Sequence, residues 1–144
     1  MAEQLFQIGI KGLVRNKDGK ILLLKTPAWG GSPEYWDLPG GRMDPGETFE
    51  QTLRRELREE ISVDYTRTAK HIATVLSNLT IPVGDIRVPL VLMAYEVDLP
   101  EGVEIKLGEE DHSLAFDWFT PEQAAQELQV KYPAEFCKSV RQLA

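Results

Sequence analysis

The stretch GRMDPGETFEQTLRRELREEISV, residues 41–63, decides the fold of this 144-residue chain. Four of its apolar residues recur at every fourth position, as residues on one face of a helix do: Phe49, Leu53, Leu57 and Ile61. Thr48 is followed three residues later by Gln51, which is the spacing of a capping box at a helix start. The stretch therefore predicts an amphipathic helix that begins after Thr48.

The same helix carries three acidic residues close together. At about 100° per residue, Glu56, Glu59 and Glu60 fall within one arc of about 100°. Like charges at this spacing repel one another, whereas carboxylates that converge from one face are the ligands of Mg²⁺, Mn²⁺ and Ca²⁺. On the helix alone, a solvated face of ion pairs is the more common outcome, and Glu50 and Arg54 fit it.

The regions outside this helix predict a mixed sheet with two further helices. Residues 7–14 and 21–25 are short apolar segments around the turn NKDG at 16–19, which predicts a β-hairpin. Residues 26–34 predict a mobile loop, and residues 70–79, 87–97 and 114–119 predict strands. The capping pattern TPEQ at 120–123 predicts a short helix to about residue 128, and a last helix is expected over 134–143.

Length and composition predict one globular domain over residues 1–144. The formal net charge of −7 opposes binding to polymeric nucleic acid and to anionic membranes. Cys137 is the single cysteine, and the sequence contains no signal-like N-terminus and no run of 18 apolar residues. We therefore expect a soluble cytoplasmic protein.

Residues 41–63 resemble the box of the Nudix (MutT-like) hydrolase family, G-x5-E-x7-R-E-U-x-E-E-x-G-U, in which U is aliphatic. The matching positions are Gly41, Glu47, Arg55, Glu56, Leu57, Glu59, Glu60 and Val63. The flanking segments WDLPGG at 36–41 and WFTPE at 118–122 are similar to those of the family as well. The resemblance therefore extends over nearly the whole chain.

One position departs from the box, because Ser62 stands where the family has its last glycine. A left-handed backbone at this helix end would cost Ser about 1 kcal/mol relative to Gly. We expect an altered helix end or a slightly lower stability, but no lost ligand.

The resemblance implies an α+β Nudix fold, an α/β/α sandwich with a mixed β-sheet between helices. It also implies that Mg²⁺, or Mn²⁺ in its place, binds the Glu56, Glu59 and Glu60 carboxylates and the Gly40 carbonyl. Glu59 is our first choice for the general base. Residues from a later acidic loop are the alternative in this role, and an equally acceptable interpretation is that they form a solvated loop: Glu109, Glu110 and Asp111.

The resemblance further implies that Glu47 folds back from outside the helix to pair with Arg55 and hold the ligands in place. Arg42 is expected to touch a substrate phosphate, with an exposed loop cation as the alternative. Trp29 is a candidate for stacking on a nucleobase, or else for core packing. Asn78 is a weaker candidate for reading a base edge.

The activity implied by the resemblance is Mg²⁺-dependent pyrophosphohydrolysis of nucleoside diphosphates linked to another group. We expect nucleoside triphosphates, including oxidised ones, to be cleaved to monophosphate and pyrophosphate. ADP-ribose or a nucleotide sugar is the competing substrate class, and a catalytically silent nucleotide sensor is the competing function. The expected partner is a small nucleotide, and the chain is expected to be a monomer or a homodimer.

Overall fold

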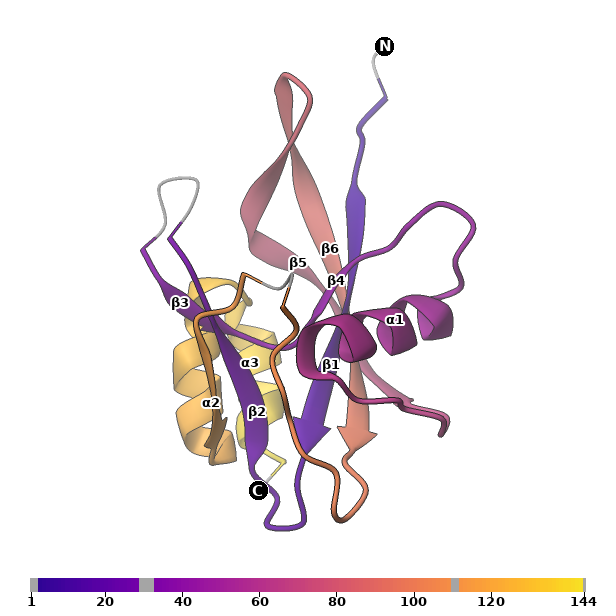
Figure 1. Cartoon of the computed structure of the whole chain (residues 1–144). Helices are drawn as coiled ribbons and strands as arrows, with labels where there is room; N and C mark the ends of the chain where they lie inside the picture. The colour runs from indigo at the N-terminus through magenta and orange to yellow at the C-terminus, as the bar shows by residue number, and fades with distance from the viewer. Residues whose placement is uncertain (1–2, 29–32, 110–111, 144) are drawn as a thin grey trace.

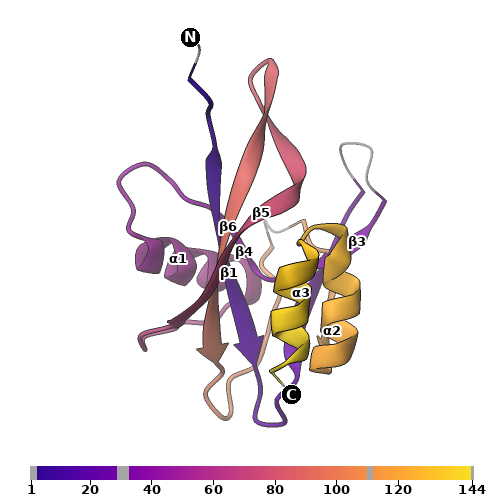
Figure 2. The same ribbon diagram turned by 180° about the vertical axis from the view of Figure 1, so that it is seen from behind.

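The computed structural model describes residues 3–28, 33–109 and 112–143. Within these residues, seven strands form one mixed sheet, with α1 on one face and α2 and α3 on the other (Figures 1 and 2). The strands are β1 (Gln7–Arg15), β2 (Ile21–Thr26), β3 (Tyr35–Asp37), β4 (Gly40–Arg42), β5 (Lys70–Val83), β6 (Ile86–Asp98) and β7 (Ala115–Phe119). The helices are α1 (Phe49–Ile61), α2 (Pro121–Glu127), the 3-10 turn η1 (Leu128–Val130) and α3 (Ala134–Arg141). The predicted α+β sandwich is confirmed.

Strand β1 organises the sheet. It runs parallel to β6 in a continuous register from Gln7 opposite Leu90 to Arg15 opposite Asp98. Its other edge pairs with β4 and, only at Arg15 and Ile21, with β2. The predicted turn at 16–19 is present, but the predicted hairpin is much shorter than expected, because the edge of β1 from Gly9 to Lys11 is taken by β4.

The core has two halves, one on each face of the sheet. Successive side chains of a strand point to opposite faces, so Leu22 and Leu24 pack toward α1 while Ile21 and Leu23 pack toward α2 and α3. All four are at most 2% exposed, and each contributes about 1.5–3 kcal/mol relative to an exposed side chain. The sheet is therefore buried on both faces at β2.

Helix α1 has the start that the sequence predicts. The Thr48 side chain accepts from the Gln51 amide, and the Gln51 side chain accepts from the Thr48 amide, which completes the capping box. Leu53, Leu57 and Ile61 are buried, as the spacing predicts. Phe49, the fourth residue of the pattern, is 39% exposed.

The end of α1 is strained, as the substitution at the box glycine predicts. Ser62 has φ 59° and ψ 36°, and it is the one non-glycine residue with positive φ in the described part of the chain. The strain is partly offset, because the Ser62 hydroxyl donates to the Lys106 carbonyl at 2.8 Å. The Lys106 and Gly108 amides donate in turn to the carbonyls of Ile61 and Glu60. The helix end is thus fastened to the loop at 105–108.

Several boundaries differ from the sequence predictions. The strands β5 and β6 run closer to their turn than predicted, to residues 83 and 86, and α3 ends at Arg141. The sequence prediction missed β3 and β4, because three-residue strands are too short to show periodicity. None of the helices in the described ranges is long and apolar enough to cross a membrane.

Candidate functional site

The short strand β4 brings the backbone against the acidic face of α1. Gly40 has φ 138°, and a Cβ there would collide with the Ile10 carbonyl, so only glycine fits. The Gly40 amide donates to Glu60 Oε1. A Cβ on Gly41 would lie 2.5 Å from Glu56 Oε1. The two glycines therefore allow β4 to contact two of the three predicted metal ligands.

Arg55 joins most of the predicted site residues in one network. Its guanidinium donates to both carboxylate oxygens of Glu47, from Nε to Oε2 at 2.7 Å and from Nη2 to Oε1 at 3.0 Å. Nη1 donates to Glu56 at 2.8 Å and to Glu59 at 3.3 Å, and Nη2 also donates to the Arg42 carbonyl at 3.1 Å. Glu47 lies before the helix and folds back, as its spacing from Arg55 requires.

Glu47 is held in its charged form. The hydrogen bonds from Arg55 and from the Asp44 amide lower the pKa of the Glu47 carboxyl to about 2, and the Thr52 hydroxyl donates to the same carboxylate at 3.0 Å. A planar guanidinium that binds a carboxylate through two bonds fixes distance and orientation together. The pair therefore fixes the loop before α1 relative to the helix.

Glu56 lies in a different environment from Glu47. Burial raises the pKa of the Glu56 carboxyl, and the attraction of Arg55 only partly opposes this rise. A cation beside Glu56 would stabilise its charged form. All the candidate ligands are oxygen atoms, so the donor set fits a hard divalent cation. Among the described residues, however, no three acidic, histidine or cysteine side chains already form a ligand cluster. Glu56 and Glu59 instead each contact Arg55.

A second cluster of charged side chains lies buried on the other side of β4. It was not predicted from the sequence. Asp37 Oδ2 accepts from Lys131 Nζ at 2.7 Å and from Lys11 Nζ at 3.2 Å. Asp37 Oδ1 accepts from the Tyr132 hydroxyl at 2.6 Å and from the Leu38 amide at 2.7 Å. We call Lys11, Asp37, Lys131 and Tyr132 the lysine cluster.

The buried charges of the lysine cluster shift one another. Burial opposes the charged form of Asp37, but Lys11 and Lys131 hold the pKa of its carboxyl far below the usual range. Burial lowers the pKa of Lys131 to about 8, whereas attraction by Asp37 and Glu60 outweighs burial and raises the pKa of Lys11. Near neutral pH the cluster therefore holds two cations and one anion.

A cavity of about 430 Å³ connects β4 with the lysine cluster. Its lining comes from β1, β4, β5, β6 and the residue after η1: Gly9, Lys11, Gly40, Gly41, Arg42, Ile81, Pro82, Leu90, Leu92 and Lys131. The strand that contacts Glu56 and Glu60 is thus also a wall of this cavity.

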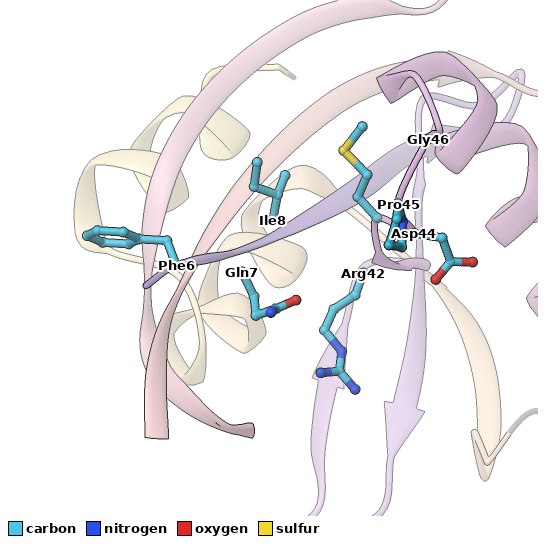
Figure 3. Close-up of a pocket in the computed structure, with 8 residues that line it drawn as sticks. Phe6, Gln7, Ile8, Arg42, Asp44, Pro45 and Gly46 are labelled. Carbon is cyan, nitrogen blue, oxygen red and sulfur yellow. The ribbon is translucent and has the colours of Figure 1, made fainter. Parts of the chain in front are cut away.

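Arg42 lies between this cavity and a second, more open one of about 580 Å³. Figure 3 shows the Arg42 side chain extending past Gln7, away from the loop that contains Asp44 and Pro45. Its guanidinium is exposed, and within residues 3–28, 33–109 and 112–143 no acidic side chain pairs with it. This position is compatible with the predicted phosphate contact.

The remaining predicted residues are not gathered at the site. Asn78 donates to the carbonyls of Gln129 and Tyr132 at 3.2 and 3.0 Å, so its amide holds the segment around η1. These bonds support the backbone beside Lys131, and the contact of Asn78 with a base edge stays a prediction. Glu109 is exposed, and Trp29, Glu110 and Asp111 lie outside the described residues.

Comparisons with known proteins agree with this geometry. The family described as NUDIX domain matches residues 5–139. A CTP pyrophosphohydrolase of Escherichia coli strain K12 is 39% identical over 59 residues, which are 41% of this chain and 44% of that protein. An 8-oxo-dGTP diphosphatase of Proteus vulgaris is 36% identical over 56 residues, 39% of this chain and 50% of that protein. The chain thus spans about half the length of the curated relatives it matches.

A solved structure extends the likeness to the whole fold. The crystal structure of a MutT protein from Methanosarcina mazei Go1 superposes with a TM-score of 0.72 at 20% identity. The superposition covers 99% of this chain and 96% of that one. At this identity the likeness concerns the arrangement of strands and helices alone.

Proposed function

Because this chain belongs to the NUDIX domain family, we propose that it is a Mg²⁺-dependent hydrolase that cleaves nucleoside triphosphates to monophosphate and pyrophosphate. One observation carries the proposal. Strand β4 touches the acidic face of α1 through Glu56 and Glu60, and the same strand lines the cavity of about 430 Å³. A nucleotide laid across β4 places its phosphates at the acidic face and its nucleoside in the cavity.

The metal-binding part of the proposal rests on donor chemistry. Members of this family generally depend on a divalent metal. We assign Mg²⁺, or Mn²⁺ in its place, to the carboxylates of Glu56, Glu59 and Glu60 with the Gly40 carbonyl. When bound, the metal neutralises phosphate charge and lowers the pKa of a coordinated water.

The chain's own residues position and activate the reactants. Glu59 is the proposed general base, because at 57% exposed its side chain is more accessible than that of Glu56, the other acid of α1 that pairs with Arg55. The bidentate contact between Glu47 and Arg55 keeps the acids of α1 in place. Arg42, exposed at the junction of the two cavities, is proposed to bind a phosphate oxygen. The cytoplasmic location and the monomeric or dimeric state stay predictions.

The test is a substrate panel with purified protein. Phosphate or pyrophosphate release is measured on the common and oxidised nucleoside triphosphates, ADP-ribose and nucleotide sugars, with millimolar Mg²⁺, with Mn²⁺ and with EDTA. We expect triphosphates to be cleaved fastest and EDTA to abolish release. Preference for ADP-ribose or a nucleotide sugar would replace the proposed substrate class. Binding of nucleotides without turnover would indicate a sensor.

A matched pair of variants separates the site from the rest of the helix. Glu50 lies on α1 like the proposed ligands, but it is exposed and pairs with Arg54. We expect Glu50→Gln to keep full activity and Glu56→Gln to lose it. Equal activities in the two variants would remove the acidic face of α1 from the proposed mechanism.

A further inference from the structure

One donor of the lysine cluster, Lys131 Nζ, lies at the cavity wall and has N–H groups without an acceptor among the described residues. The side chains of Lys11, Asp37 and Lys131 are at most 10% exposed. Two ammonium groups share one carboxylate, so the cluster has a net positive charge balanced in part by Glu60, which faces Lys11. A cavity wall of this kind favours groups with hydrogen-bond acceptors.

The two lysines differ in how many of their N–H groups are used. Lys11 Nζ donates to Asp37, to the Leu38 carbonyl and to the Gly40 carbonyl at 3.2, 3.2 and 3.3 Å, so all three of its N–H groups have acceptors. Lys131 Nζ donates to Asp37 alone among the described residues. Two of its N–H groups therefore remain for whatever occupies the cavity that it lines.

The position of Lys131 is fixed before any ligand binds. The backbone carbonyl of Lys131 accepts from the backbone amide of Asn78 at 2.8 Å and from the Ser77 hydroxyl at 3.2 Å. The next residue, Tyr132, donates to Asp37 and accepts from the Asn78 side chain. A donor held this firmly loses little entropy when it binds an acceptor, and it discriminates well against groups that cannot accept.

The opposite walls of the cavity are apolar. Ile81, Leu90 and Leu92 come from β5 and β6, and Gly9 adds no side chain on β1. This combination suits a flat, largely apolar ring with acceptors on one edge, because the ring faces contact aliphatic side chains while the edge meets the ammonium group.

We propose that Lys131 is a specificity-determining residue that selects nucleobases with a keto oxygen at the edge facing it. The inference rests on the proposed function, since it takes the cavity occupant to be the base of the nucleotide substrate. Guanine, hypoxanthine and uracil present such an oxygen. Adenine and cytosine present an amino group at the corresponding position, and its N–H groups would face the N–H groups of Lys131.

Two pairs of substrates test the inference without any mutation. ITP and ATP differ at C6 of the purine, and UTP and CTP differ at C4 of the pyrimidine, in each case by a keto oxygen against an amino group. We expect kcat/KM to be about 10- to 100-fold higher for ITP than for ATP and for UTP than for CTP, mainly through KM, since a hydrogen bond to a charged group is lost. Assays at pH 7 keep Lys131 protonated.

Variants at position 131 assign the preference to this residue. We expect Lys131→Met, which is similar in length and has no donor, to reduce both ratios to within about threefold of unity. Lys131→Gln keeps a donor for Asp37 but also offers an acceptor to amino groups, and it should have the same effect if the Met variant does not fold. Lys138→Met, which removes an exposed lysine of α3, is the matched control and should keep both ratios.

The outcomes separate this inference from the proposed function. Hydrolysis of all four triphosphates with equal kcat/KM would overturn the role of Lys131 and leave the proposed function standing. A keto preference that survives in both folded variants would also overturn it. Absence of Mg²⁺-dependent hydrolysis of any triphosphate would instead overturn the proposed function, on which the inference depends.

Discussion

The acidic face of α1 and the lysine cluster lie on opposite sides of β4 and are built in opposite ways. The Arg55 network draws its side chains from residues 44–59, is partly exposed and has an excess of negative charge. The hydrogen bonds of the lysine cluster join residues up to 95 positions apart, and the cluster is buried and has an excess of positive charge. The proposed metal site thus lies near solvent, while the proposed recognition group lies in the interior.

The largest effect that separates the two regions is expected at Glu59. Replacement by Gln should lower turnover by about 100-fold or more, because the proposed base and one metal ligand are lost together. The melting temperature should change little, since the Glu59 side chain is 57% exposed. Steady-state rates with saturating Mg²⁺ and thermal melts provide the check. Near-normal turnover would exclude Glu59 as the general base and would favour Glu109 in that role.

The corresponding change in the lysine cluster should affect stability. Asp37→Asn removes the carboxylate that two buried ammonium groups share, which we expect to cost about 3–5 kcal/mol in the free energy of unfolding. Urea denaturation at pH 7 measures the loss. Asp64→Asn is the control, because Asp64 pairs with Arg58 at the surface and should cost less than about 1 kcal/mol. Similar losses in both variants would mean that burial adds nothing to the cost of breaking the ion pairs of the lysine cluster.

A smaller effect is expected from Arg55→Lys. Lysine keeps the charge but cannot bind both oxygens of Glu47 while it also contacts Glu56 and Glu59. We expect turnover to fall by about 10- to 100-fold, with a higher Mg²⁺ concentration needed for half-maximal rate. Titration of the rate with Mg²⁺ distinguishes this result from a loss of fold. An unchanged Mg²⁺ dependence would show that Arg55 does not position the ligands.

The smallest effect concerns the end of α1. Ser62→Ala keeps the left-handed strain and loses the bond to Lys106, so it should cost about 1 kcal/mol. Ser62→Gly loses the same bond but removes the strain, so it should be about 1 kcal/mol more stable than the Ala variant. Thermal melts of both variants measure the difference. An Ala variant as stable as the Gly variant would contradict the account of strain at Ser62.

The same contrast explains how far the sequence alone could predict this molecule. Features that depend on neighbours within one or two helical turns were predicted: the Thr48 capping box, the buried face of α1, the Glu47 contact with Arg55 and the left-handed Ser62. The capping box and the buried face follow from spacing along the chain, because helix geometry converts spacing directly into position. The Glu47 contact and the backbone of Ser62 were expected from the resemblance to the Nudix box.

The features that escaped prediction depend on contacts between distant segments. Nothing near Lys131 or Lys11 marks them as partners of Asp37, since an isolated lysine in a sequence is most often exposed. The Asn78 side chain offers donors and an acceptor to many partners, and only the fold shows that two backbone carbonyls accept from its donors. The β4 strand also escaped prediction, because three residues are too short to show periodicity and its place is determined by pairing with β1.

The long separation within the lysine cluster has a consequence for the order in which the chain acquires its structure during synthesis. The Arg55 network needs only one contiguous stretch and can form soon after that stretch leaves the ribosome. Asp37 must wait for Lys131 and Tyr132, 94 and 95 residues later, before its charge is shared as in the finished fold. A nascent chain therefore contains the residues of its acidic helix well before those that close the wall of the cavity beside the lysine cluster.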